Sequence, residues 1–155
     1  MNENKTNINW YPGHMAKTKK QIIEDLKLID IVIEILDARI PLASQNPDIE
    51  NCIKDKNKII VLNKADLADN NITNKWIEFY KSNGIKAIAV ESNNSKGIKE
   101  VIEAIKSEYD IIKEKYMQKG RIGRAIRVMI VGIPNVGKST FINSIAKRNT
   151  AKVGN

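Results

Sequence analysis

The sequence contains very little cysteine and histidine. Among its 155 residues, Cys52 is the only cysteine and His14 is the only histidine. A disulfide within the chain is therefore excluded, and so is a metal cluster built from several cysteine and histidine ligands. Cys52 shares an apolar helical stripe with Ile49 and Ile53. We therefore expect its thiol to pack as a small hydrophobic group rather than to react.

Long apolar runs are also missing. No stretch approaches the roughly 20 apolar residues that a membrane-spanning helix needs. The first nine residues are polar and lack the apolar stretch of a signal peptide. With 42% hydrophobic and 28% charged residues, the chain has the composition of one globular domain. We expect that domain to lie in the cytoplasm.

Positive charge is concentrated in two segments. The 26 lysine and arginine residues outnumber the 18 acidic residues and give a net charge of +8, which favours polyanionic partners. Each segment fits either an ordinary solvated surface or a contact with RNA, and the sequence leaves both interpretations open. The cations are Lys5, Lys17, Lys19 and Lys20 within residues 1–21, and Lys113, Lys115, Lys119, Arg121, Arg124 and Arg127 within residues 113–127.

Strand-like and helix-like patterns alternate along the chain. Four apolar runs rich in β-branched residues predict buried parallel strands at residues 29–36, 58–62, 85–90 and 125–131. Amphipathic stretches separate these runs. The alternation predicts an α/β fold with a doubly wound parallel sheet.

The amphipathic stretches predict five helices. Gly84 and Gly120 are expected to end the third and fourth of them, and Lys138 is expected to begin the last. Their apolar stripes are Met15, Ile22, Ile23 and Leu26; Pro47, Ile49, Cys52 and Ile53; Ile72, Trp76, Phe79 and Tyr80; Ile98, Val101, Ile102, Ile105, Tyr109, Ile112 and Tyr116; and Phe141, Ile142 and Ile145.

A glycine-containing segment near the C-terminal end carries the first functional motif. Residues 132–139, GIPNVGKS, match the pattern G-x-x-x-x-G-K-[ST] between a predicted strand and a predicted helix. The two glycines let several backbone N–H groups point at one phosphate, and the helix N-terminus adds partial positive charge. Lys138 is expected to reach the β- and γ-phosphates as a catalytic cation, and Ser139 to bind Mg²⁺. The candidate nucleotide-binding residues here are Pro134, Asn135, Val136, Gly137, Lys138, Ser139 and Thr140.

The second motif, Asn63-Lys64-Ala65-Asp66, directly follows the predicted strand at 58–62. It looks like the N-K-x-D motif with which GTPases recognise guanine. The carboxylate of Asp66 can accept hydrogen bonds from guanine N1–H and from the exocyclic amine, a donor pair that adenine lacks. We expect Asn63 to bridge neighbouring loops and the aliphatic stem of Lys64 to cover the face of the base.

A third element, Ser92-Asn93-Asn94, follows the predicted strand at 85–90. GTPases usually have Ser-Ala-Lys in a loop at this point, where backbone N–H groups support the base. Only Ser92 matches, and Asn93 departs from the alanine. Two interpretations stay open: a base-supporting loop with Ser92 and Asn93 at the nucleotide, or a simple turn into the next helix.

The motifs occur in an unusual order, and the chain contains further distinctive segments. Common GTPases place the phosphate loop first, whereas here it comes last, so the order is circularly permuted. Together with this order, the segments NWYPGHMAK at 9–17, DARIP at 37–41 and GIPNVGKST at 132–140 resemble the ribosome biogenesis GTPase A family of bacteria. The resemblance extends over essentially the whole chain. It implies a circularly permuted P-loop GTPase domain in residues 1–155 that hydrolyses GTP during maturation of the large (50S) ribosomal subunit.

The resemblance also implies cofactors, partners and two further residue roles. GTP or GDP, Mg²⁺ and K⁺ are the implied ligands, and the precursor of the large subunit with its rRNA is the implied partner of a monomeric protein. Asn135 matches the asparagine that helps to hold K⁺ near the phosphates, or it only shapes the loop. His14 matches a histidine proposed to orient the attacking water, which an imidazole can do near neutral pH. A capping or packing role for His14 is the alternative.

Some family features are absent from the sequence. The switch threonine linked to Mg²⁺ and the helical C-terminal domain have no counterpart, and no D-x-x-G pattern occurs. We therefore expect a truncated domain, an impaired Mg²⁺ site, and an unpaired outer edge on the strand at 125–131. The alternative function is a guanine-nucleotide-binding module without turnover. An ATP-dependent enzyme would require Asn63-Lys64-Ala65-Asp66 to be a coincidence.

Overall fold

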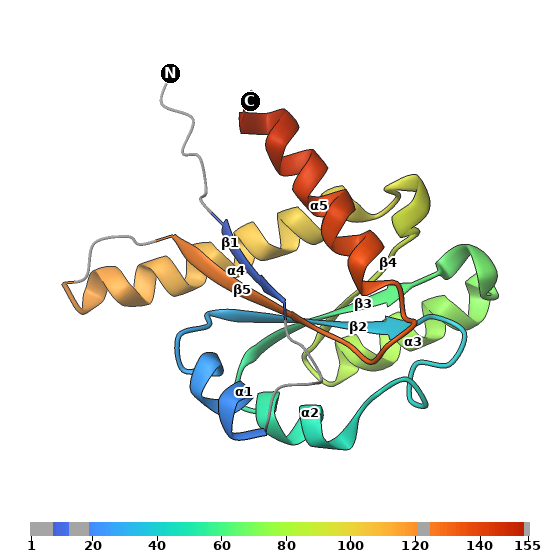
Figure 1. The fold of residues 1–155 in the computed structure, drawn as a ribbon, viewed down its shortest axis with the longest axis horizontal. Coiled ribbons are helices and arrows are strands. Elements are labelled where there is room, and N and C mark those ends of the chain that lie inside the picture. The colour runs from blue at the N-terminus through green and yellow to red at the C-terminus, as the bar shows by residue number, and fades with distance from the viewer. Residues whose placement is uncertain (1–7, 13–18, 121–124, 154–155) are drawn as a thin grey trace.

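The computed structural model describes residues 8–12, 19–120 and 125–153. Within them, five strands form one parallel sheet with the order β1-β5-β2-β3-β4 (Figure 1). The α/β class and the parallel sheet are therefore confirmed. The strands are β1 (Ile8–Pro12), β2 (Ile31–Asp37), β3 (Asn57–Asn63), β4 (Lys86–Ala89) and β5 (Ile126–Val131).

Helices connect the strands and begin and end close to the predicted points. Asn46 and Asp69 accept hydrogen bonds from the first backbone N–H groups of α2 and α3, which stabilises the starts of these helices. Gly84 and Gly120 have positive φ angles of 73° and 72° just after α3 and α4, as expected of residues that end helices. The helices are α1 (Lys19–Leu26), α2 (Pro47–Ile53), α3 (Asn70–Ser82), α4 (Ile98–Gln118) and α5 (Lys138–Val153), with short 3₁₀ turns η1 (Ala65–Leu67) and η2 (Ser92–Asn94).

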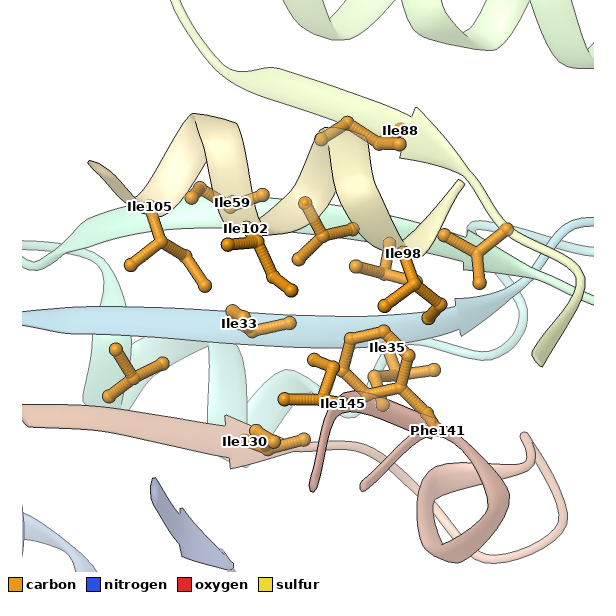
Figure 2. Packing of buried hydrophobic residues seen from close by; sticks show 14 of the residues in the cluster. Ile33, Ile35, Ile59, Ile88, Ile98, Ile102, Ile105, Ile130, Phe141 and Ile145 are labelled. Carbon is orange, nitrogen blue, oxygen red and sulfur yellow. The ribbon is translucent and has the colours of Figure 1, made fainter. Parts of the chain in front are cut away.

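The helices cover both faces of the sheet, because alternate side chains of a strand point to opposite sides. On one face, Ile31, Ile33 and Ile35 of β2 pack with α4 and α5 in the largest apolar cluster (Figure 2). On the other face, α1 and α2 form one apolar cluster with the sheet and α3 forms another. Phe141 and Ile145 of α5 are fully buried, as their predicted stripe requires. Together, the two layers fix the carboxyl ends of the strands, where the candidate site lies.

The expected open edge beside β5 is wrong. β1 pairs in parallel with β5 from Ile8 opposite Ile126 to Pro12 opposite Ile130, and Trp10 packs against the large apolar cluster. The sequence of β1 is a weak strand signal because it is short and ends in proline. Proline is tolerated there because β1 is an edge strand, whose outer N–H groups need no partner in the sheet.

The apolar stripes predicted for α1 and α3 are only partly correct. Ile72 and Phe79 of α3 are 54% and 49% exposed, whereas Tyr80 is 4% exposed. Thr73, which the stripe omitted, takes a buried position one turn before Ile77. In α1, Leu26 is buried but Ile23 is 43% exposed. In both helices, the buried face is narrower than the predicted apolar stripe, so some apolar side chains of the stripe are exposed.

Candidate functional site

The predicted motif residues meet at the carboxyl edge of the sheet. The segments that follow β3, β4 and β5 all leave the sheet at this edge, the usual ligand-binding side of an open parallel sheet. They enclose a cavity of about 370 Å³. Its lining residues are Asn63, Lys64, Asp66, Leu67, Ser92, Asn93, Asn135, Gly137 and Thr140.

Asn63 is the residue that joins these three segments. Its side chain is buried, and its amide nitrogen donates to the carbonyl oxygen of Val136 at 2.8 Å. Its amide oxygen accepts from the hydroxyl of Ser92 at 2.7 Å and from the backbone N–H of Ser92 at 3.3 Å. The prediction that Asn63 bridges neighbouring loops is confirmed. Ser92 lies in the turn η2 before α4, and these contacts join it to the N-K-x-D segment; its role toward a nucleotide stays a prediction.

Gly137 is required by the close packing of these segments. Its φ angle is +86°, and a Cβ atom at this position would lie 2.4 Å from the amide nitrogen of Asn63. Any side chain would therefore both strain the backbone and displace Asn63. Asn135 also has a positive φ, of 72°, which asparagine tolerates better than most residues. The phosphate loop thus has the tight curl that its sequence predicts.

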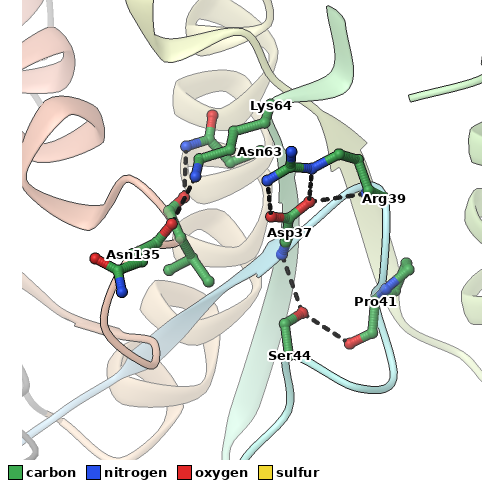
Figure 3. Close-up of polar contacts among 8 residues, drawn as sticks. Asp37, Arg39, Pro41, Ser44, Asn63, Lys64 and Asn135 are labelled. Carbon is green, nitrogen blue, oxygen red and sulfur yellow. Dashed lines mark hydrogen bonds and ion pairs between the residues drawn. The ribbon is translucent and has the colours of Figure 1, made fainter. Parts of the chain in front are cut away.

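Lys64 spans from the second motif to the phosphate loop. Its backbone is left-handed, with a φ of 59°, and its ammonium group donates to the carbonyl oxygen of Asn135 at 2.6 Å (Figure 3). Asp66 lies exposed in the turn that follows. Asp66 and Lys64 both line the cavity, as the base-recognition hypothesis requires.

The phosphate loop leads into α5 at Lys138, as predicted. The first turn of α5 closes when the N–H of Phe141 donates to the carbonyl oxygen of Gly137 at 3.0 Å. Partial burial lowers the pKa of the Lys138 ammonium, because burial disfavours the charged form. Ser139 and Thr140 lie exposed in the same turn. This turn combines a helix N-terminus, a lysine and two hydroxyl groups, which together suit a phosphate anion.

The remaining predicted site residues have different environments. Val136 is buried in the large apolar cluster, so only its backbone is available to a ligand. Pro134 is exposed on the loop. His14 lies outside the described residues, so its predicted role stays a prediction.

Ser144 of α5 is a contributor that the sequence did not reveal. Its buried hydroxyl donates to the carbonyl oxygen of Ser92 at 2.7 Å. This contact ties the third motif to the helix that follows the phosphate loop. A serine inside an amphipathic helix carries no signal of such a contact, because the partner is 52 residues away.

Two charged residues at the carboxyl end of β2 form an ion pair. Asp37 and Arg39 form a two-bond ion pair, with Arg39 Nη2 at 2.7 Å from Asp37 Oδ2 and Arg39 Nε at 3.0 Å from Asp37 Oδ1 (Figure 3). The sequence marked this segment only as part of the DARIP resemblance. Asp37 is opposite Asn63 in the β2–β3 register, so the segment lies at the same edge of the sheet without lining the cavity.

A larger cavity lies elsewhere, along β4 between α3 and α4. Its volume is about 730 Å³. Glu100, Glu103 and Glu108 line it, with Lys86 as the cation of the lining. This charge and the absence of a glycine from its lining make it unsuited to phosphate. The smaller cavity at the carboxyl edge is therefore the candidate site.

Comparisons with known proteins agree with this geometry. The family model described as 50S ribosome-binding GTPase matches residues 127–155. Ribosome biogenesis GTPase A of Bacillus cereus is 51% identical over 150 residues, which cover 95% of this chain and 50% of that protein. The chain therefore spans about half the length of the curated relatives that it matches.

Solved structures give the same result. The GNP-bound YlqF from T. maritima matches with a TM-score of 0.61 and 35% identity, covering 82% of this chain and 46% of that chain. A GDP-bound structure of the T. maritima protein matches with a TM-score of 0.62 and 34% identity, covering 83% and 48%. The chain thus has the fold of a circularly permuted P-loop GTPase and is similar in sequence, over 95% of its length, to ribosome biogenesis GTPase A.

Proposed function

We propose that residues 1–155 are the base-binding and phosphate-binding part of a circularly permuted GTPase domain. The observation that carries this proposal is the Asn63 side chain, which holds the N-K-x-D segment, the Ser92 loop and the phosphate loop around one cavity. These three elements are far apart in the sequence and have separate predicted roles toward one ligand. Their convergence favours a guanine nucleotide over an unrelated use of any single motif.

Each wall of the cavity has a distinct role toward that ligand. Asp66 accepts hydrogen bonds from the guanine edge, and the Lys64 stem covers the base. The curled backbone at Gly137 and the start of α5 bind the phosphates, and Lys138 neutralises their charge. ATP is disfavoured because adenine would leave the carboxylate of Asp66 unpaired.

Mg²⁺ and K⁺ would be held at the phosphate loop. The Ser139 hydroxyl lies exposed in the first turn of α5. This fits Mg²⁺, which in nucleotide sites takes few protein ligands and completes its shell with phosphate oxygens and water. The exposed Asn135 on the same loop would contribute to K⁺. Both cations would neutralise phosphate charge.

We further propose GTP hydrolysis in the assembly of the large ribosomal subunit, with precursor rRNA as the partner. The support is the similarity to ribosome biogenesis GTPase A and to GNP-bound and GDP-bound YlqF. His14 would orient the attacking water. Because ribosome precursors lie in the bacterial cytoplasm, the protein would act there. It would act as a monomer. None of the helices in the described part of the chain is both long and apolar enough to cross a bilayer.

Nucleotide titration tests the binding proposal. The wild-type chain is expected to bind fluorescent GDP. Unlabelled GDP should displace the fluorescent GDP, whereas the same concentration of ADP should not. Lys138→Ala should lose most GDP affinity because it removes the cation of the phosphate loop. The exposed Lys99→Gln serves as a charge-matched control on α4. GDP binding of wild-type strength by Lys138→Ala, or equal displacement by ADP, contradicts the proposal.

Single-turnover hydrolysis tests the role of His14. With Mg²⁺ and K⁺ present, His14→Ala should slow GTP cleavage by about 10²-fold or more, the range for loss of a general base or water-orienting group. GDP affinity should stay unchanged. Equal cleavage rates for the variant and the wild type would leave His14 as a capping or packing residue.

A further inference from the structure

Ser144 lies on the same face of α5 as Thr140, which is one helical turn earlier and lines the cavity. Ser144 itself is buried, where α5 packs against the turn η2. A serine inside a helix commonly bonds to the carbonyl oxygen four residues earlier in its own helix. Here the hydroxyl instead donates across to η2, to the carbonyl oxygen of Ser92 at 2.7 Å.

This contact closes a ring of hydrogen bonds through the three motif segments. The hydroxyl and the N–H of Ser92 donate to Asn63 Oδ1 at 2.7 and 3.3 Å. The amide nitrogen of Asn63 donates to the carbonyl oxygen of Val136 at 2.8 Å. From Val136, the chain leads into α5 and so to Ser144. Within this ring, only the Ser144 bond reaches the peptide group between Ser92 and Asn93.

That peptide group has the carbonyl oxygen of Ser92 at one end and the N–H of Asn93 at the other. Because a trans peptide group is planar, its two ends point in opposite directions. By holding the carbonyl oxygen, Ser144 therefore fixes the direction of the Asn93 N–H. The N–H of Ser95 donates to the same oxygen, but at 3.3 Å. The shorter bond from Ser144 is the stronger constraint.

The N–H of Asn93 is available to a ligand. Asn93 is exposed and lines the cavity, and within the described part of the chain its N–H donates to no other group. Guanine carries an acceptor, the 6-oxygen, next to the N1–H that Asp66 is proposed to bind. Adenine carries a donor, an amino group, at the same place. A backbone N–H at this wall therefore suits guanine.

We propose that Ser144 is a positioning residue for base recognition: by holding the carbonyl oxygen of Ser92, it directs the N–H of Asn93 at the 6-oxygen of the purine. The proposal rests on guanine-nucleotide binding as proposed above. Ser144 does not line the cavity, so it acts through the peptide group and does not touch the base. Its bond to the carbonyl oxygen also polarises the N–H at the other end, which strengthens the bond of that N–H to an acceptor.

Competition between GDP, 6-thio-GDP and IDP tests this role. In 6-thio-GDP, a sulfur, which is a weak acceptor, replaces the 6-oxygen, so the ratio of GDP affinity to 6-thio-GDP affinity reports the contact with that oxygen. Ser144→Ala is expected to lower this ratio about threefold or more, the range for loss of one hydrogen bond. IDP keeps the 6-oxygen and lacks the 2-amine. The GDP-to-IDP ratio, which reports Asp66, should therefore keep its wild-type value.

Three further serine variants sharpen the test. Ser144→Thr keeps the hydroxyl and should keep the wild-type ratio of GDP to 6-thio-GDP. Ser144→Cys fills the space with a weaker donor, so it folds even where Ser144→Ala fails, and its ratio should fall. The matched control is Ser82→Ala, which removes a hydroxyl that donates to a backbone carbonyl oxygen at 2.7 Å at the end of α3. It should leave both ratios unchanged.

A wild-type ratio of GDP to 6-thio-GDP in the folded Ser144→Ala or Ser144→Cys protein overturns the proposal. Equal losses of affinity for all three nucleotides also overturn it, because they indicate a purely structural role. So does a Ser144→Thr protein whose ratio falls as far as that of Ser144→Ala, since the hydroxyl then has no special part. A wild-type chain without preference for GDP over ADP overturns the proposed function itself, and this inference with it.

Discussion

At the scale of single residues, the site depends on one buried amide and one glycine. Asn63 satisfies its amide nitrogen and oxygen with Val136 and Ser92, so its removal would leave a buried carbonyl and hydroxyl without partners, at a cost of about 1–3 kcal/mol. Gly137 leaves the room that Asn63 occupies. The N-K-x-D segment and the phosphate loop are therefore joined through this contact.

Gly137→Ala tests that coupling. The new Cβ would meet the amide nitrogen of Asn63 at 2.4 Å on a backbone with a φ of +86°. We expect GDP affinity to fall at least tenfold, and the free energy of unfolding to fall by more than the roughly 1–2 kcal/mol of left-handed strain alone. GDP titration and urea denaturation measure the two effects.

Gly84→Ala is the matched control for this variant. Gly84 also has a positive φ, of 73°, but an added Cβ meets no atom within 4 Å. It should lose stability through backbone strain while keeping its GDP affinity. If Gly137→Ala and Gly84→Ala bind GDP equally well, the contact between Gly137 and Asn63 is not important for the site.

The sequence predicts residues whose role follows from a local pattern and misses those whose role follows from a distant partner. Gly137 and Lys138 are recognisable because the phosphate loop is contiguous. Asn63 is recognisable because the N-K-x-D segment implies its bridging role. Ser144 and the Asp37–Arg39 pair were not assigned a function, because their importance arises only when α5 and β2 are packed beside the other loops.

At the scale of elements, the same distinction separates the inner strands from β1. β2, β3 and β5 are mainly apolar on both faces, a pattern typical of strands that are covered on both sides. β1 is recognised only through its pairing with β5, more than a hundred residues later. A strand pairing between segments so far apart in the sequence leaves no local periodicity that would reveal it. The prediction of an open edge failed for this reason.

Glu34 is a polar residue in the middle of β2, on the face covered by α2 and α3. It is 2% exposed, and Lys58 Nζ lies 3.7 Å from its Oε1 atom and 3.2 Å from Oε2 of Glu50. Burial, followed by hydrogen bonding to Glu50, raises the pKa of Glu34 to about 8, against the opposing charge of Lys58. Burial and the two glutamates also raise the pKa of Tyr80 to about 12.

This environment predicts that stability falls as pH rises. Below the ordinary value of 4.5, both the native and the unfolded chain carry the Glu34 proton. Between about 4.5 and 8, the unfolded chain has lost the proton and the native protein retains it, so unfolding is favoured as pH rises. The loss by pH 8 should be on the order of a few kcal/mol.

Glu34→Gln isolates this effect. The amide keeps the shape of the protonated carboxyl but does not titrate. Urea denaturation between pH 5 and pH 8 should show a smaller decrease in unfolding free energy for Glu34→Gln than for the wild type. The control Glu103→Gln, at a side chain 62% exposed, should follow the wild type. Identical pH slopes for Glu34→Gln and the wild type would refute the assignment.

At the scale of the whole molecule, the order of motifs along the chain differs from their order in space. The N-K-x-D segment comes first and the phosphate loop last, yet β5 inserts between β1 and β2 in the sheet. All carboxyl ends of a parallel sheet share one edge, so the segments after β3, β4 and β5 enclose one cavity. Circular permutation therefore leaves the candidate site intact, and the fold class could be predicted from sequence for the same reason.

Nucleotide selectivity after Asp66→Asn is the most direct test of guanine recognition in this cavity. An asparagine amide donates where the carboxylate accepted, so it should pair with the 2-carbonyl oxygen of xanthine instead of the 2-amine of guanine. Titrations of GDP and XDP are expected to show GDP preferred by the wild type and XDP preferred by Asp66→Asn, with phosphate binding retained in both. An Asp66→Asn protein that keeps the wild-type preference for GDP would contradict guanine recognition in this cavity.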